Sequence, residues 1–319
     1  MYFDLLLFSS LVYLPLAAGT IARRWGVFKK DISKSVMSFS WLALEPFVIA
    51  VAFWSLDLKQ LADLAAAPLI GAAWMVVMFA PACLVAARLK LKHPQRGNFW
   101  LATMFSNNGI TLGAFLCMVL RGEPGLVMAM LFTLGFMPLL LTVGFAIGKH
   151  SARKAAPAGS DPTSKPPLTT LRLVPYSAIA LGLTLNLAGA HRPALAPVVT
   201  RYLVFADVAL YSFAIGTLFV LGSVRRYLRE CIAMSGLKFI VGPLVGLMLF
   251  FVASQFVGLS PLLLQVVIVQ CAMPVAIMSV VVSRFCGLDM QLAAACWVFT
   301  TLAVAAVVPV LAHVVPLVG

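Results

Sequence analysis

The stretch FSNNGITLG, Phe105–Gly113, places two amides, hydroxyl groups and two glycines inside an otherwise apolar segment. In hydrocarbon, an unpaired polar side chain or backbone group costs several kcal/mol of free energy. A membrane helix that contains such a run must therefore open there onto a cavity or onto other parts of the protein. We interpret this stretch as a break in a helix, and the rest of the chain is interpreted around it.

A second interruption, QCAMPV at Gln270–Val275, places a proline in an equally apolar segment. Pro274 has no backbone N–H, so a carbonyl one turn upstream loses its helical donor. We expect the two interruptions to face each other.

The composition indicates that both stretches lie in a membrane. Hydrophobic residues make up 62% of the 319 residues and charged residues 10%, and the mean hydropathy is +1.04. Soluble domains contain about 25% charged residues. We therefore expect a polytopic protein in a lipid bilayer. The net charge of +13 is then attributed to basic cytoplasmic loops, and no nucleic-acid partner is expected.

The chain contains ten apolar runs of about the 20 residues that a spanning helix requires. They lie at residues 4–22, 34–54, 66–88, 98–120, 125–148, 171–190, 199–223, 233–257, 261–284 and 290–315. If both termini lie outside, the inner loops hold all of the 23 Lys and Arg, with Lys238 counted among them, except Lys59, Arg121, Arg192 and Arg201. This asymmetry predicts a multi-pass membrane protein with its N- and C-termini outside.

Residues 149–170 form the one long connection, and their Pro, Ser and Ala content predicts a cytoplasmic linker. The linker separates two halves, 1–148 and 171–319, with five runs each. Because five is odd, the second half must cross the membrane inverted relative to the first. At an offset of 165 residues, Gly109 falls on Pro274. The predicted fold is an all-α polytopic membrane protein of ten transmembrane helices, a 5+5 inverted repeat with broken crossing helices 4 and 9, which is the organisation of secondary transporters.

The broken helices supply the candidate binding site. Half-helix N-termini present unpaired N–H groups and a partial positive charge, which suits an anionic substrate. Asn107, Asn108 and Thr111 can donate and accept hydrogen bonds beside them, and Gly109 lowers the cost of leaving helical geometry. The alternative is that the two amides only bond neighbouring helices and that Pro274 is an ordinary kink.

Two carboxylates lie inside apolar runs. Glu45 is midway along 34–54, and Asp207 is inside 199–223, about one helical turn from the repeat position of Glu45. Intramembrane carboxylates are functional candidates, so we predict that they are coupling groups. The alternatives are that Asp207 lies near the outer end beside Arg201, or that Glu45 is a protonated structural donor.

The residues resemble the auxin efflux carrier family, which includes plant PIN-type carriers and bacterial malate and malonate permeases. The resemblance rests on Met273–Pro309, with its small-residue run at Ala293–Ala295, and on Asn107–Gly109. It implies that Asn107, Asn108, Met273 and Pro274 line the crossing point where the substrate anion binds. It departs from the family pattern at Leu112, where a glycine is usual, and at the second break, which has Met-Pro in place of Pro-Asn.

The predicted function is secondary transport of a small organic anion, a mono- or dicarboxylate, across the inner (plasma) membrane of a bacterium. It proceeds by alternating access at the crossing of helices 4 and 9, with proton coupling left open. A sodium-coupled symporter of the bile-acid type is the alternative, and a membrane-embedded sensor is a weaker one. We do not expect an enzyme, a metal site or a cofactor, because the sequence has no H-E-x-x-H, G-x-S-x-G or Cys/His ligand spacing. A homodimer is left open, since Gly144–Gly148 and Gly242–Gly246 permit close helix contacts.

Overall fold

The computed structural model describes residues 2–26, 32–58, 60–155, 174–218 and 222–318, and within them the secondary structure is helical, with no strand. Among these described residues, seven helices are long and apolar enough to cross a membrane. They are Leu6–Arg24, Ser35–Trp54, Leu61–Arg88, Gly113–Ala155, Ala196–Leu218, Leu228–Ser254 and Met290–Val318. The expectation of an all-helical, polytopic membrane protein is therefore confirmed.

The number of ten spans stays a prediction. Two further apolar helices, Val174–Leu187 and Pro261–Cys271, are shorter than a full span. Gly113–Ala155 has 43 residues, which is about twice the length that one span needs. It is interrupted at Gly122, whose φ of 66° lies outside the helical region.

The described chain forms two compact units, and each contains segments from both halves of the sequence. Unit 1 consists of Met1–Leu61, Gly109–Met130 and Leu168–Phe219, and unit 2 of Ala62–Asn108, Leu131–Pro167 and Val220–Gly319. The division falls inside the first predicted break, between Asn108 and Gly109.

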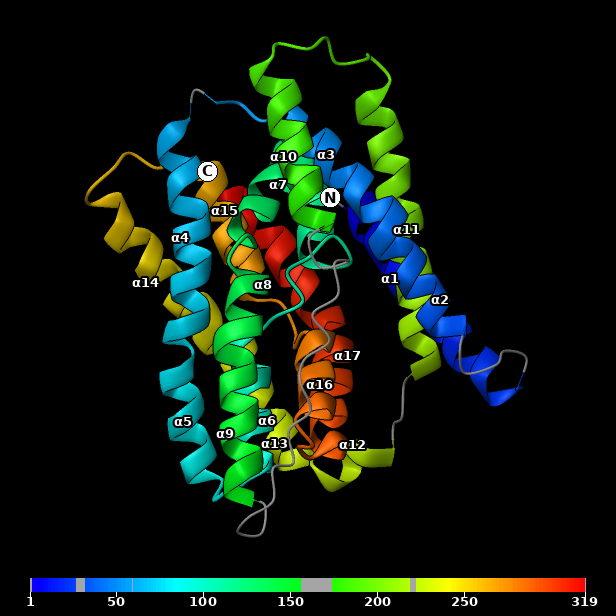
Figure 1. The fold of residues 1–319 in the computed structure, drawn as a ribbon, viewed down its shortest axis with the longest axis vertical. Helices are drawn as coiled ribbons and strands as arrows, with labels where there is room; N and C mark the ends of the chain where they lie inside the picture. The colour runs from blue at the N-terminus through cyan, green and yellow to red at the C-terminus, as the bar shows by residue number, and fades with distance from the viewer. Residues whose placement is uncertain (1, 27–31, 59, 156–173, 219–221, 319) are drawn as a thin grey trace. The chain divides into compact units, whose positions relative to one another are not determined.

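Unit 1 is built on close helix pairs. Its helices are α1 (Tyr2–Arg24), α2 (Ile32–Phe39), η1 (Ser40–Leu44), α3 (Glu45–Trp54), most of α7 (Gly113–Phe132), α10 (Val174–Leu187) and α11 (Ala196–Leu218). Figure 1 shows α1 and α2 alongside α11. A Cβ built at Gly19 would lie 2.1 Å from the carbonyl oxygen of Phe213, and one at Gly216 would lie 2.1 Å from that of Leu16. The backbones of α1 and α11 approach this closely because both positions are glycine.

Unit 2 packs around α17. Its helices are α4 (Leu61–Val77), α5 (Phe79–Arg88), α6 (Gln95–Met104), α8 (Phe136–Leu139), η2 (Leu140–Gly144), α9 (Phe145–Ala155), α12 (Gly222–Arg226), α13 (Leu228–Gly236), η4 (Leu237–Val241), α14 (Gly242–Ser254), α15 (Pro261–Cys271), α16 (Ile277–Phe285), α17 (Met290–Val314) and η5 (Val315–Val318). In Figure 1 α6, α13 and α16 lie against α17. The buried Trp74 of α4 donates from Nε1 to the carbonyl of Gly242 at 2.8 Å and ties α4 to the start of α14.

Two π-helical turns lie directly before prolines. The turn η1 ends one residue before the pair Glu45-Pro46, and η4 ends one residue before Gly242-Pro243. A proline cannot donate to the carbonyl four residues earlier, so the preceding turn widens to make other hydrogen bonds. Ser40 belongs to the first of these wide turns and Lys238 to the second.

The predicted linker, 149–170, lies mostly outside the described residues. Its first part, up to Ala155, continues the helix α9, whose last turn contains Arg153 and Lys154. Basic side chains are favourable there because they lie near the unpaired carbonyls and the negative end of the helix dipole.

Candidate functional site

The first break lies where the sequence predicts it. Helix α6 ends at Met104, and α7 begins at Gly113. The chain between them leaves helical geometry at Phe105, with φ −107° and ψ 122°.

The second break interrupts the segment 261–284 in the same way. Helix α15 ends at Cys271 and α16 begins at Ile277, so Ala272–Ala276 is non-helical. Ala276, at φ −70° and ψ 138°, precedes α16 in an extended conformation, with no side-chain cap for the first N–H groups of that helix.

The two non-helical segments are hydrogen-bonded to each other within unit 2. Ser106 and Val275 form an isolated antiparallel bridge. The N–H of Asn107 donates to the carbonyl of Pro274 at 2.8 Å, and that of Ala276 donates to Phe105 at 3.1 Å. Some of the peptide groups that each helix loses at its break are thus satisfied by the other break, as an apolar environment requires.

The amide of Asn108 is the clearest unsatisfied group at this junction. Its side chain is 2% exposed, and neither Nδ2 nor Oδ1 has a hydrogen-bond partner among the described residues. Its backbone carbonyl, by contrast, accepts from Nε2 of Gln270 at 3.1 Å. A buried amide without partners costs free energy, and a ligand that supplies partners recovers that cost.

The other predicted site residues divide between the two units. Asn107 is half-buried and Met273 and Pro274 are buried, and all three belong to unit 2 with Asn108. Gly109 and Thr111 belong to unit 1, where the carbonyl of Gly109 accepts from the N–H groups of Leu112 and Ala114 before α7 begins. The structure therefore brings four of the six residues together in one unit.

Lys238 is a charged residue at the first break that the sequence analysis placed wrongly. Counted there among the inner-loop residues, it is 0% exposed in η4, inside the apolar segment Leu228–Ser254. Its Nζ donates to the carbonyls of Thr103 at 2.8 Å and Phe105 at 3.1 Å, and to Oγ of Ser106 at 2.8 Å. The signal that could have found it was its position inside the apolar run 233–257.

Unit 1 brings the two predicted coupling carboxylates together. Asp207 is 0% and Glu45 9% exposed, and their carboxylates lie close enough to repel each other. The hydroxyl of Ser40 donates to Oδ1 of Asp207, while Oδ2 is buried without a hydrogen-bond partner among the described residues. Two buried carboxylates this close favour binding of a proton or a metal cation between them.

Taken together, these features define a class: an all-helical, multi-pass membrane protein in which two helices are discontinuous and their breaks are hydrogen-bonded to each other. The profile of the Sodium Bile acid symporter family matches residues 192–316, less than half of the chain. A search of curated proteins finds no match. The family match supports a transport function, and it favours the sodium-coupled symporter over the organic-acid carrier that the sequence analysis put first.

The resemblance to the auxin efflux carrier family is wrong, because the matching family is the Sodium Bile acid symporter family. The residues that carried the resemblance, Asn107–Gly109 and Met273–Pro274, are those that break helices. Polar, glycine and proline residues are needed wherever a membrane helix is discontinuous. They indicate a kind of architecture and do not separate families that share it.

Proposed function

We propose that the protein is a secondary transporter that moves an organic anion together with sodium, a symporter of the bile-acid type. The observation that carries this proposal is the match of residues 192–316 to the Sodium Bile acid symporter family. The matched segment includes the second break, Ala272–Ala276, and the buried Asp207. A proton-coupled carrier is the second candidate, because the Glu45 and Asp207 pair is also suited to a proton.

The substrate anion binds at the paired breaks of unit 2. The Asn108 amide donates to it from Nδ2, and Asn107 lies beside it. Met273 and Pro274 contribute apolar surface and backbone. Support for this assignment comes from the unpartnered amide of Asn108 and from the non-helical start of α16, whose N–H groups favour an anion.

The coupling cation binds in unit 1 between Glu45 and Asp207. Carboxylate oxygens suit sodium, and a bound cation relieves the repulsion between two buried negative charges. The unpartnered Oδ2 of Asp207 supports this assignment. The hydroxyl of Ser40 keeps Oδ1 of Asp207 in place.

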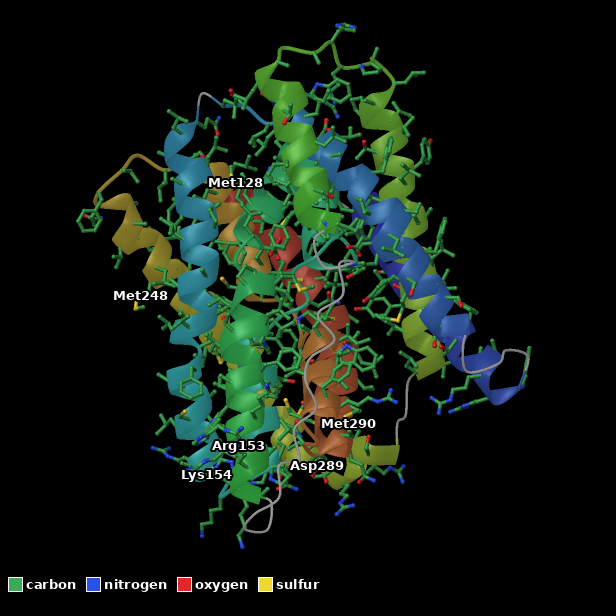
Figure 2. All side chains as sticks on the ribbon, viewed as in Figure 1. Met128, Arg153, Lys154, Met248, Asp289 and Met290 are labelled. Atoms are coloured by element: carbon green, nitrogen blue, oxygen red, sulfur yellow. The ribbon has the colours of Figure 1, made fainter. Side chains whose placement is uncertain are left out.

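The finer membrane arrangement belongs to the same proposal. It comprises ten spans as a 5+5 inverted repeat, alternating access at the crossing of the broken helices, and both termini outside a bacterial inner membrane. The orientation is supported by the basic residues at one end of unit 2. Figure 2 shows Arg153 and Lys154 of α9 at the same end of unit 2 as Asp289 and Met290, where α17 begins. Basic residues favour the cytoplasmic side, so the proposal assigns this end to the cytoplasm.

Thermal unfolding of the purified protein in detergent tests the proposal. Bile acids and small mono- and dicarboxylates are each added in sodium chloride and in potassium chloride. Binding to the folded state raises the Tm, so we expect at least one anion to raise it more in sodium than in potassium. Equal shifts in both salts that grow as the pH is lowered would support proton coupling instead. No shift with any anion contradicts the transporter proposal.

A further inference from the structure

Lys238 lies where an apolar helix would ordinarily contain no charge, and its polar surroundings match an ammonium group. An ammonium has three N–H donors and no acceptor. Lys238 has three oxygen partners, at 2.8, 3.1 and 2.8 Å. Two of these are carbonyl oxygens, which can only accept. Within the described part of the chain, no carboxylate forms an ion pair with Lys238.

The oxygens around Lys238 Nζ come from the C-terminal end of a half-helix. The carbonyls of Thr103 and Phe105 lie at the end of α6, where the helix stops and its last carbonyls lose their helical N–H donors. The Phe105 carbonyl also accepts from the N–H of Ala276 in the second break. Ser106 adds a hydroxyl one residue further on. Half-helix C-termini and unwound carbonyls are the groups that hold the coupling cation in transporters with broken helices. The ligands at the end of α6 are therefore those of a monovalent-cation site.

The ring of Trp74 lies beside this site. Its ring lies 5.5 Å from Nζ of Lys238, within the range of a cation–π interaction. The ring is fixed because Nε1 donates to the carbonyl of Gly242, which follows η4 on the same helix as Lys238. Trp74 is 0% exposed, so the site is shielded from water and contacts to it are strong.

We infer that Lys238 fills a monovalent-cation site at the end of α6, with its ammonium as a tethered cation in place of a free ion. The break then keeps a positive charge at any ion concentration. Ser106, one of the ligands, precedes Asn107 in the chain. If the proposed function is correct, this tethered charge also attracts the substrate anion, and sodium must bind elsewhere, at Glu45 and Asp207.

The test is to remove the tether and supply a free ion. In Lys238→Ala, the oxygens keep their places but lose their cation. The Tm is measured in ammonium, sodium and potassium chloride against choline chloride, whose cation is too large for the site. We expect at least one small cation to raise the Tm of Lys238→Ala by about 3 °C or more at roughly 100 mM. The same variant is made with Asp207→Asn, so that binding at the proposed coupling site does not contribute to the shift.

Lys238→Met is the matched control, because methionine fills the space of the lysine stem without a charge. It is likewise combined with Asp207→Asn, and in that background its Tm should not depend on which cation is present. A Lys238→Ala protein that shows no added cation response, or that cannot be recovered in any of the three small-cation salts, overturns the inference. Recovery that requires one of those salts supports it.

A second measurement separates this inference from the proposed function. If both are correct, Lys238→Met binds the anion about 10-fold more weakly than the wild type, and a small cation restores binding to Lys238→Ala. A cation response of Lys238→Ala in a protein that binds no organic anion would leave the cation site standing and reject the transport proposal.

Discussion

At the scale of single residues, the candidate sites contain buried polar groups that lack hydrogen-bond partners. The Asn108 amide and the Oδ2 atom of Asp207 are both buried and lack hydrogen-bond partners among the described residues. Such groups lower the stability of the folded protein. They are therefore the positions at which function and stability separate most clearly under mutation.

Asn108→Ala should weaken anion binding without lowering stability. A hydrogen bond to a charged group contributes about 1.5–3 kcal/mol, so we expect a loss of affinity of roughly 10- to 100-fold. The Tm should stay unchanged or rise, because an unpartnered amide is removed. Anion titration by thermal shift or calorimetry measures both quantities.

Gln255→Ala is the matched control, since it also replaces an amide but at an exposed position at the end of α14. It should change neither affinity nor Tm by much. If Asn108→Ala lowers the Tm and leaves binding intact, the amide has a structural role and the assigned site is wrong.

Asp207→Asn should remove the sodium dependence of anion binding. The substitution keeps the size of the side chain but removes one of the two charges that would hold the cation, so affinity in sodium should fall to the level seen in potassium. The measurement is the anion affinity across a sodium titration. Glu230→Gln is the control, because it removes a carboxylate elsewhere, in the first turn of α13. It should retain the full sodium response. If it also loses the response, the effect of Asp207→Asn is not specific to the proposed site.

Sequence reasoning succeeds at residues whose chemistry conflicts with an apolar run, and fails where loop and helix assignments compete. The sequence predicts that Glu45 and Asp207 lie inside membrane helices; the structure buries both within unit 1, and their role as coupling groups stays a prediction. Lys238 was assigned to an inner loop because basic residues usually flank membrane helices. Its burial depends on acceptors at the end of α6, and these are invisible until the breaks are folded.

At the scale of helices, the contact between α1 and α11 depends on reciprocal glycines. Gly216→Ala would place a methyl group on the carbonyl of Leu16, where the built Cβ lies 2.1 Å from the oxygen. We expect a loss of about 1–3 kcal/mol of unfolding free energy, which a lower Tm or urea midpoint would show.

Gly236→Ala provides the comparison, because Gly236 is helical and a Cβ there meets nothing within 4 Å. Alanine is the better helix former by about 1 kcal/mol, so this variant should be as stable as the wild type or more so. Equal stability of both variants would show that α1 and α11 can separate without cost.

Asp289 connects the start of α17 to α6 and to Tyr227, the residue that precedes α13. Its Oδ1 accepts from the N–H groups of Gln291 and Leu292, and Oδ2 accepts from Gln95 and from the hydroxyl of Tyr227, both at 3.0 Å. Burial raises the pKa of Asp289, but these hydrogen bonds lower it by more, so the pKa lies below its ordinary 3.8. The ionised carboxylate thus stabilises the fold.

Asp289→Ala should lower the free energy of unfolding at neutral pH by an amount typical of a lost helix cap, about 1 kcal/mol or more. A lower Tm would show this loss. Because the folded pKa is depressed, this stabilisation is complete above pH 3.8 and is lost as the pH falls through the folded value. The difference in Tm between wild type and variant should therefore shrink below that pH. A constant difference down to pH 3 would show that the charge does not matter.

Helix breaks are predictable from sequence, and their hydrogen bonds are not. Glycine, asparagine and proline identify both breaks; the first lies within its predicted stretch, and the second extends one residue beyond it, to Ala276. The pairing of Asn107 with Pro274 and the wide turns η1 and η4 depend on which carbonyls find donors in three dimensions. The apolar run 98–120 also gives no indication in the sequence that its residues divide between two compact units after Asn108.

At the scale of the whole molecule, hydropathy determines the class of protein and the chemistry of the breaks does not determine the family. The apolar composition correctly predicts a multi-pass helical protein. The choice of relatives was wrong, since the matching family is the Sodium Bile acid symporter family. The proposed sodium coupling would depend on a few buried oxygens, those of Asp207 and Glu45, which come from segments distant in sequence.

The most direct test of the central claim is uptake of a labelled bile acid, or of the anion found by thermal shift, into proteoliposomes with an imposed ion gradient. An inward sodium gradient should drive accumulation above the external concentration, and Asp207→Asn should abolish that accumulation. Uptake that is indifferent to sodium and driven by an inward proton gradient would contradict sodium coupling. Absence of uptake under every gradient, from a protein that is folded and binds the anion, would contradict transport itself.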